Sequence, residues 1–138
     1  MRILAVDLGT VRTGVAVCDK GEVLASPLCT VQEGNPEKVP AKIMEIAVAE
    51  KAEMIVVGHP KNMDGSCGES AKRAEVFAEK LRGLSELPVS LWDERMTTMT
   101  AIGFLNETDV RGKKRKEVID AVSASIILQN FLDSRKKL

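Results

Sequence analysis

The 138-residue chain is poor in the residues that carry several common chemistries. It has three cysteines, Cys18, Cys29 and Cys67, and no two stand in a CxxC spacing, so neither a disulfide framework nor a zinc site is indicated. We interpret them as small core or loop residues. His59 is the only histidine, so a catalytic triad with a histidine base would have to use it. We interpret His59 as a loop residue near the functional edge of the fold rather than as a catalyst.

Long apolar runs are also absent. No stretch reaches the roughly 18 residues that a membrane span requires, and Asp7 interrupts the first apolar run too early for a signal peptide. We therefore expect a cytoplasmic protein with no membrane partner. The net charge is zero, but residues 111–138 carry +5 and residues 1–110 carry −5. The basic end is either a surface that steers a polyanion or a solvated loop with a frayed terminus.

The length suits one domain, residues 1–138, and the apolar pattern predicts the element order βββαβαβαα. Strands are expected at residues 3–7, 14–18, 22–25, 54–58 and 88–92. Helical spacing begins at Val39, and further helices are expected at residues 69–82, 97–105 and 118–132, with a charged loop at 111–116. Two strand–helix–strand crossovers after an antiparallel meander predict an α/β fold, with a five-stranded mixed sheet and helices on both faces.

Carboxylates stand where this sheet should bind a ligand. Asp7 ends the first strand, and Asp93 and Glu94 end the last, so both sets should lie at the edge formed by the carboxyl ends of the parallel strands. Asp120 interrupts a small, apolar helical stretch, VIDAVSASIIL, where an unpaired carboxylate would be costly. Each could be a turn cap or a salt-bridge partner, but three on one edge favour a site. Hard oxygen ligands of this kind suit Mg²⁺ or Mn²⁺ and phosphodiester hydrolysis.

The stretch around Asp7, AVDLGTVRTGVAV, leaves two alternatives open. Gly9 and Gly14 could let backbone N–H groups wrap a phosphate, or they could only permit a tight hairpin. Arg12 could contact a phosphate, or it could pair with a carboxylate.

Four blocks together resemble the YqgF/RuvX family. They are VDLGTVRTGVAVCD, VVGHPKNMDGSCGESAKRAEVFAEKL, WDERMTTMTA and VIDAVSASIILQNFL, and they span nearly the whole chain in order. The resemblance implies a ribonuclease H-like fold related to Holliday-junction resolvases. It also implies a nuclease that processes the 5′ end of pre-16S rRNA in ribosome biogenesis, although some members are assigned junction-resolving activity instead.

The resemblance also implies roles for particular residues. Asp7, Glu94 and Asp120 match the catalytic acidic positions expected to hold Mg²⁺ or Mn²⁺. Other motif positions and the basic segment are expected to bind nucleic acid: Arg12, Arg95, Thr98, Lys113, Lys114, Arg115 and Lys116. His59 and Lys61 depart from the family pattern, in which position 59 is more usually aliphatic.

We therefore predict a metal-dependent endonuclease acting on structured RNA or branched DNA. Two other classes compete with it. The glycine-rich hairpin also resembles the phosphate-binding hairpin of actin-like ATPases, but those proteins need a second domain and a second phosphate loop that this chain lacks. A non-catalytic binding module is the third reading. The oligomeric state, monomer or homodimer, stays open because it depends on the substrate. Resolution of a branched junction requires a dimer with two sites.

Overall fold

The computed structural model describes residues 1–60, 64–94 and 112–136, and within the last helix the side chains of residues 119–135. The elements in chain order are β1 (Ile3–Asp7), β2 (Arg12–Cys18), β3 (Ala25–Gln32), α1 (Val39–Ala49), β4 (Met54–His59), α2 (Glu69–Leu84), β5 (Val89–Asp93) and α4 (Gly112–Lys136). The predicted helix at residues 97–105 lies outside the described residues.

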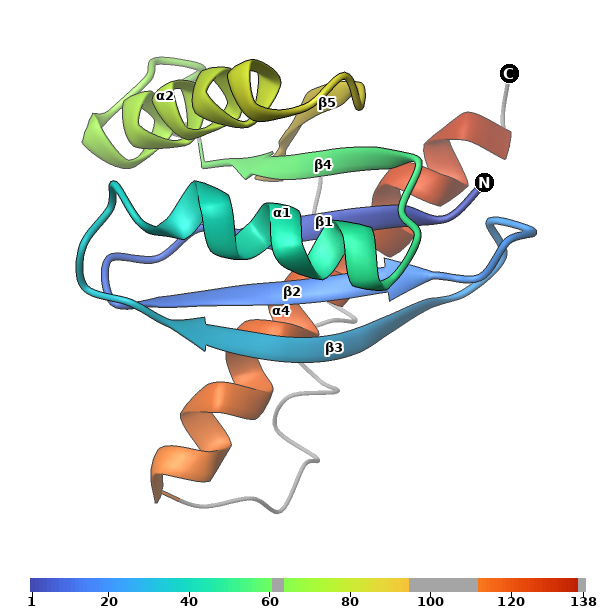
Figure 1. The fold of residues 1–138 in the computed structure, drawn as a ribbon, viewed down its shortest axis with the longest axis horizontal. Coiled ribbons are helices and arrows are strands. Elements are labelled where there is room, and N and C mark those ends of the chain that lie inside the picture. Colours follow the sequence, from blue (N-terminus) through green and yellow to red (C-terminus); the bar gives the residue numbers. More distant parts are fainter. Residues whose placement is uncertain (61–63, 95–111, 137–138) are drawn as a thin grey trace.

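The strands form one five-stranded sheet in the order β3-β2-β1-β4-β5. The meander β1–β2–β3 is antiparallel, whereas β1, β4 and β5 are parallel, with Leu4 opposite Ile55 and His59 opposite Asp93. The predicted mixed sheet is therefore confirmed. The carboxyl ends of β1, β4 and β5 lie along one edge, at the left of Figure 1.

Helices cover both faces of the sheet. Leu4 and Val6 of β1 belong to the core that includes Ile43 of α1 and Phe77 of α2. The residues of β1 that point to the other face, Ile3 and Ala5, belong to a second core together with residues of α4. This helix crosses behind the sheet in Figure 1. Because side chains alternate between the faces of a strand, every odd-numbered position of β1, including Asp7, belongs to the α4 face.

One glycine lets α4 lie close to the sheet. A Cβ atom added at Gly14 would stand 1.9 Å from the backbone oxygen of Asp120, a separation that no real side chain tolerates. Gly14 therefore permits the backbone of α4 to touch β2, and this contact fixes where Asp120 stands. Gly9 permits the tight connection between β1 and β2, because a Cβ there would meet the carbonyl oxygen of Arg12 at 2.1 Å.

The third strand exists, but its predicted bounds, residues 22–25, are wrong except at Ala25. The carboxylate of Asp19 accepts the backbone N–H groups of Val23 (2.8 Å) and Leu24 (3.0 Å), and Glu22 has a φ of 56°. These features make residues 19–24 a turn, so the third strand begins only at Ala25. It includes Pro27, which an edge strand accommodates because one side of its backbone needs no ladder partner.

The charged loop expected at residues 111–116 is also wrong for residues 112–116, because α4 already begins at Gly112. Lysine and arginine are good helix formers, and a run of them does not oppose a helix that tertiary contacts hold further along. Among the described helices, none combines the length and the apolar character needed to cross a membrane.

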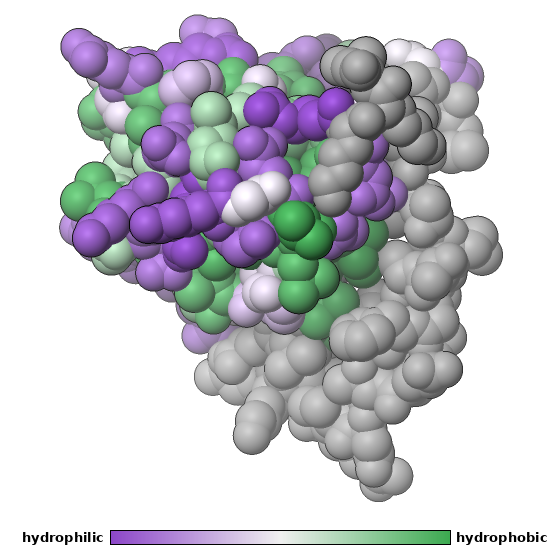
Figure 2. All heavy atoms as spheres, turned by 90° about the vertical axis from the view of Figure 1, so that its right-hand side faces the viewer, coloured by the Kyte–Doolittle hydropathy of each residue, from purple (hydrophilic) through white to green (hydrophobic). Residues whose placement is uncertain are grey.

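The amino ends of the parallel strands lie at the opposite edge. Figure 2 looks onto this side of the molecule, and its described residues present mainly hydrophilic side chains with separate hydrophobic spots. Asp7 and Asp93, the last residues of β1 and β5, stand at the other end of their strands.

Candidate active site at the carboxyl edge of the sheet

Asp7 is the last residue of β1, and its position in the strand places it on the α4 face of the sheet. The preceding residues of β1 are fully buried, so the carboxyl group stands at the border of the core. Burial raises the pKa of Asp7 to about 6, and the negative charge of Asp120 adds to the shift. Such a group favours a proton or a cation beside it.

Glu94 follows β5 directly and reaches the same face. A Cβ added at Gly58 of β4 would lie 3.0 Å from Cδ and 3.1 Å from Oε2 of Glu94, so the glycine leaves room for this carboxylate. Burial, then the charges of Asp7 and Asp93, raise the pKa of Glu94 to about 7. Asp93, which is aligned with His59, belongs by strand alternation to the opposite face. The structure thus distinguishes the two neighbouring carboxylates.

Asp120 comes from α4 and completes the predicted set. Its Oδ2 accepts a hydrogen bond from Nε of Arg12 at 2.9 Å, and both side chains are about one-third exposed or less. Of the two partners considered for Arg12, the structure places it against a carboxylate. The positive charge of the guanidinium offsets one of the three negative charges in this part of the molecule.

Asp7 links the set electrostatically, since it interacts with both Asp120 and Glu94. Carboxylate oxygens without nitrogen or sulfur donors are the ligands that Mg²⁺ or Mn²⁺ prefers. The raised pKa values of Asp7 and Glu94 indicate that too little positive charge surrounds these two carboxyl groups to stabilise their ionised forms. The donor chemistry therefore fits a hard divalent cation. The arrangement is nevertheless open: in the described part of the chain, the ligand atoms of these three residues do not all lie within 4.8 Å of one another.

Some predicted nucleic-acid contacts cannot be placed. Arg95 and Thr98 lie outside the described residues. Lys113, Lys114, Arg115 and Lys116 lie in the first turns of α4, and their side chains are not described. On the helix backbone, position 116 stands one turn before Asp120, about 6 Å along the axis.

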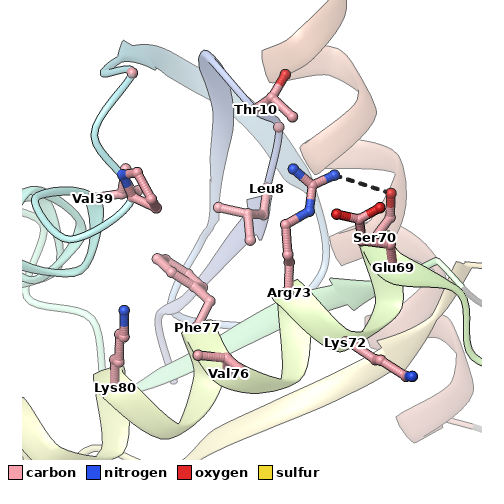
Figure 3. Close-up of a pocket in the computed structure, with 13 residues that line it drawn as sticks. Leu8, Thr10, Val39, Glu69, Ser70, Lys72, Arg73, Val76, Phe77 and Lys80 are labelled. Atoms are coloured by element: carbon pink, nitrogen blue, oxygen red, sulfur yellow. Dashed lines mark hydrogen bonds between the residues drawn. The ribbon is translucent and has the colours of Figure 1, made fainter.

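A separate pocket of about 460 Å³ lies on the other face, between α1, α2 and the β1–β2 connection. Figure 3 shows Leu8, Val39 and Phe77 around it, with Arg73 donating a hydrogen bond to Oγ of Ser70 at 3.2 Å. Val39 and Phe77 follow helical periods that predict core positions, and Leu8 directly follows a buried strand, so the sequence carries no signal for this pocket.

His59 is not the loop residue that we expected. It is the last residue of β4, and only 6% of its surface is exposed. Its side chain lies near Cys67 and Glu75, on the face away from Glu94. The spacing of these three residues matches no familiar ligand motif, which is why the sequence did not indicate this cluster.

The sheet order and the two helical layers define the class, a ribonuclease H-like fold of the resolvase type. The structure of Thermus thermophilus RuvC superposes with a TM-score of 0.61 at 14% identity, covering 99% of this chain and 97% of that one. The Fowlpox virus resolvase, in complex with Holliday junction DNA, gives 0.60 at 10% identity, covering 98% and 99%.

The family profile of RuvX, described as Holliday junction resolvase, matches residues 1–134. The chain belongs to this family. A relative from Caldanaerobacter subterraneus is 42% identical over 99% of both chains, and one from Pelotomaculum thermopropionicum is 45% identical over 98% of this chain and 88% of its own. Both carry the name "Putative pre-16S rRNA nuclease". The membership predicted from the four sequence blocks is thus confirmed, and it places the chain among nucleases.

Proposed function

We propose that the chain is a divalent-metal-dependent endonuclease that hydrolyses phosphodiester bonds in structured nucleic acid, with Asp7, Glu94 and Asp120 as its catalytic and metal-binding residues. One observation carries the proposal. Two carboxylates from strands far apart in sequence stand at the same edge and face, and Asp7 interacts electrostatically with Glu94 and with Asp120.

The residues of the chain have distinct tasks in this proposal. Asp7 and Glu94 release their protons and supply oxygen ligands to Mg²⁺ or Mn²⁺. Arg12 pairs with Oδ2 of Asp120 and offsets the charge of this carboxylate while no metal is bound. Cations held by these residues would supply an activated water and would stabilise the leaving oxygen of the cleaved bond. Gly58 keeps the space that Glu94 occupies.

The substrate that we favour is the 5′ end of pre-16S rRNA, since relatives over 40% identical along nearly the whole chain bear that name. A cytoplasmic location goes with an rRNA-processing role and is part of this proposal. Branched DNA is the second candidate, because the family profile is described as a junction resolvase. Basic residues 113–116, with Arg95 and Thr98, are proposed to contact the phosphates of either substrate.

Cleavage assays separate these substrates. The purified chain is incubated with a pre-16S rRNA leader and with a four-way DNA junction, in Mg²⁺, in Mn²⁺ and in EDTA. We expect metal-dependent cleavage of the leader at one defined site and little cleavage of the junction. Paired symmetric cuts in the junction by a dimer would shift the assignment to resolvase. If neither substrate is cleaved in Mg²⁺ or in Mn²⁺, the nuclease proposal is contradicted.

A further inference from the structure

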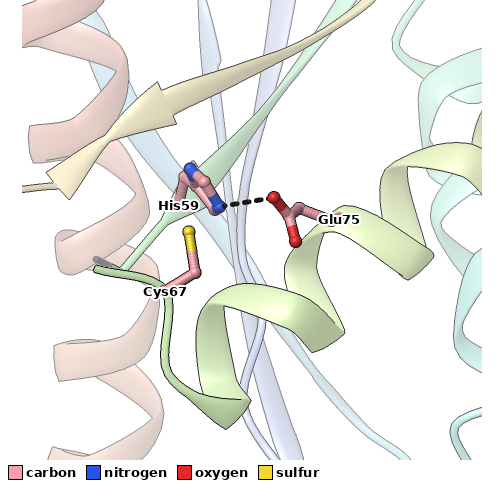
Figure 4. Close-up of side chains that lie close together, drawn as sticks. All are labelled: His59, Cys67 and Glu75. Atoms are coloured by element: carbon pink, nitrogen blue, oxygen red, sulfur yellow. Dashed lines mark ion pairs between the residues drawn. The ribbon is translucent and has the colours of Figure 1, made fainter. Parts of the chain in front are cut away.

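A second cluster of ligand-type side chains lies on the opposite face of the sheet from the acidic site. It consists of His59 at the end of β4, Cys67 just before α2, and Glu75 within α2. Figure 4 shows the sulfur of Cys67 and the carboxylate of Glu75 pointing toward the imidazole ring. One ligand atom from each residue lies within 4.8 Å of the other two.

The imidazole of His59 is the observation that calls for a ligand. Its side chain is 8% exposed, and within the described part of the chain its Nε2 is buried without a hydrogen-bond partner. Oε1 of Glu75 is 3.4 Å away, close enough for an ion pair but not in hydrogen-bond geometry. Buried polar atoms are nearly always satisfied, so an unsatisfied nitrogen aimed at a thiol and a carboxylate needs a reason.

The spacing suits a tetrahedral metal. With ligand distances of about 2.0–2.3 Å, neighbouring N, O and S ligands of tetrahedral Zn²⁺ are about 3.4–3.6 Å apart. The nitrogen and oxygen of His59 and Glu75 already have this separation, at 3.4 Å. Cys67 is exposed and lies in the segment before α2, so its sulfur can close the remaining distance by a rotation of its side chain.

We propose that His59, Cys67 and Glu75 form a binding site for a divalent transition metal of the zinc class. Nitrogen, sulfur and oxygen donors together select such an ion over Mg²⁺, so this site and the acidic site take different metals. Three protein ligands leave a fourth position for water. Binding deprotonates the thiol of Cys67 and releases that proton to solvent. The metal joins the end of β4 to α2.

Cobalt spectroscopy tests this site without an activity readout. The chain is freed of metal, and Co²⁺ is added as a substitute for Zn²⁺. We expect one equivalent to produce the visible absorption of a tetrahedral site and a thiolate-to-cobalt charge-transfer band in the near ultraviolet, both removed by stoichiometric Zn²⁺. Lack of a charge-transfer band, or binding of Zn²⁺ weaker than micromolar, would overturn the proposal.

Single substitutions assign the ligands. Cys67→Ser should abolish the charge-transfer band, and Glu75→Gln should weaken Zn²⁺ binding at least about tenfold. Both residues are at least partly exposed, so these variants should fold, which circular dichroism verifies. Cys29→Ser, a half-buried cysteine in β3, is the matched control and should keep the band. Asp7→Asn should also keep it, because the acidic site is separate. A band that persists in Cys67→Ser overturns the assignment.

Discussion

Arg12 and Asp120 are joined across 108 positions of the sequence, with Nε of the arginine 2.9 Å from Oδ2 of the carboxylate. The pair links the start of β2 to α4 next to the point where Gly14 admits the helix backbone. Arg12 therefore competes with a metal for the charge of Asp120, and the two interactions cannot be optimised together.

Removing this competition should strengthen metal binding. We expect Arg12→Gln to bind Mn²⁺ more tightly than the unaltered chain, by about threefold to tenfold, and to lose about 0.5–1 kcal/mol of stability, since the pair is partly exposed. Calorimetric titration with Mn²⁺ measures the first effect and urea unfolding the second.

Arg2→Gln is the matched control for that experiment. Arg2 pairs with Glu50 at a comparable exposure, but at the amino edge of the sheet, so its loss should leave Mn²⁺ binding unchanged. Equal Mn²⁺ affinities for Arg12→Gln and the unaltered chain would show that Arg12 does not restrain Asp120.

The contact between Gly14 and α4 should be intolerant of any side chain. A Cβ at this position would overlap the Asp120 backbone oxygen, so Gly14→Ala must push the helix off the sheet. We expect a loss of about 3 kcal/mol or more, at the upper end of overpacking effects, and weaker metal binding because Asp120 moves. Gly34→Ala, where a Cβ meets nothing within 4 Å, should leave the free energy of unfolding unchanged or raise it slightly. Similar melting temperatures for the two variants would contradict the close approach.

The raised pKa values of Asp7 and Glu94 predict a pH effect on the metal-free chain. Both carboxyls have folded-state pKa values, about 6 and about 7, above their ordinary values of about 4, so the folded chain binds more protons between these limits. Their contribution to the free energy of unfolding therefore falls as pH rises from about 4 to 7, and it stays low above pH 7.

Asp7→Asn removes part of this penalty. In EDTA we expect the free energy of unfolding of the variant, taken relative to that of the unaltered chain, to rise by about 1–3 kcal/mol from pH 5 to pH 8. Urea unfolding at both pH values measures this difference. Adding Mn²⁺ at pH 8 should stabilise the unaltered chain and not the variant. A stability difference that is the same at pH 5 and pH 8 would refute the burial-driven shift.

The basic segment at the start of α4 should contribute affinity without chemistry. Replacing Lys113, Lys114, Arg115 and Lys116 with glutamine should weaken nucleic-acid binding and flatten its dependence on salt, because fewer counterions are released. Filter binding at several salt concentrations measures the slope, and thermal unfolding checks that the fold is retained. An unchanged slope would place the phosphate contacts elsewhere.

Much of this architecture was predictable because it depends on local patterns. The apolar runs that end at Asp7 and at Asp93 have the length and composition of buried strands, and their parallel order follows from the crossover helices. Convergence of Asp7 with Glu94 at one edge follows from that order alone. That residues 1–138 form one domain remains a prediction.

Other features depend on contacts between distant segments. The register and pleat of β5 decide whether Asp93 or Glu94 faces α4. A shift of the register by one residue would exchange the two side chains between the faces of the sheet. The turn at residues 19–24 depends on hydrogen bonds from Asp19, while the partner of Arg12 depends on where α4 crosses the sheet. The cluster around His59 joins a strand end, a loop and a helix, so no sequence period marks it.

Single-turnover cleavage by Glu94→Gln, compared with Glu45→Gln, tests the central claim most directly. Glu94 stands beside Asp7 at the carboxyl edge, whereas Glu45 is an exposed residue of α1. On the better-cleaved substrate in Mn²⁺, we predict that Glu94→Gln lowers the rate by at least about 100-fold, about 2.7 kcal/mol of transition-state stabilisation, and that Glu45→Gln leaves it unchanged. Equal rates for the two variants would contradict a nuclease site built on the acidic residues of this edge.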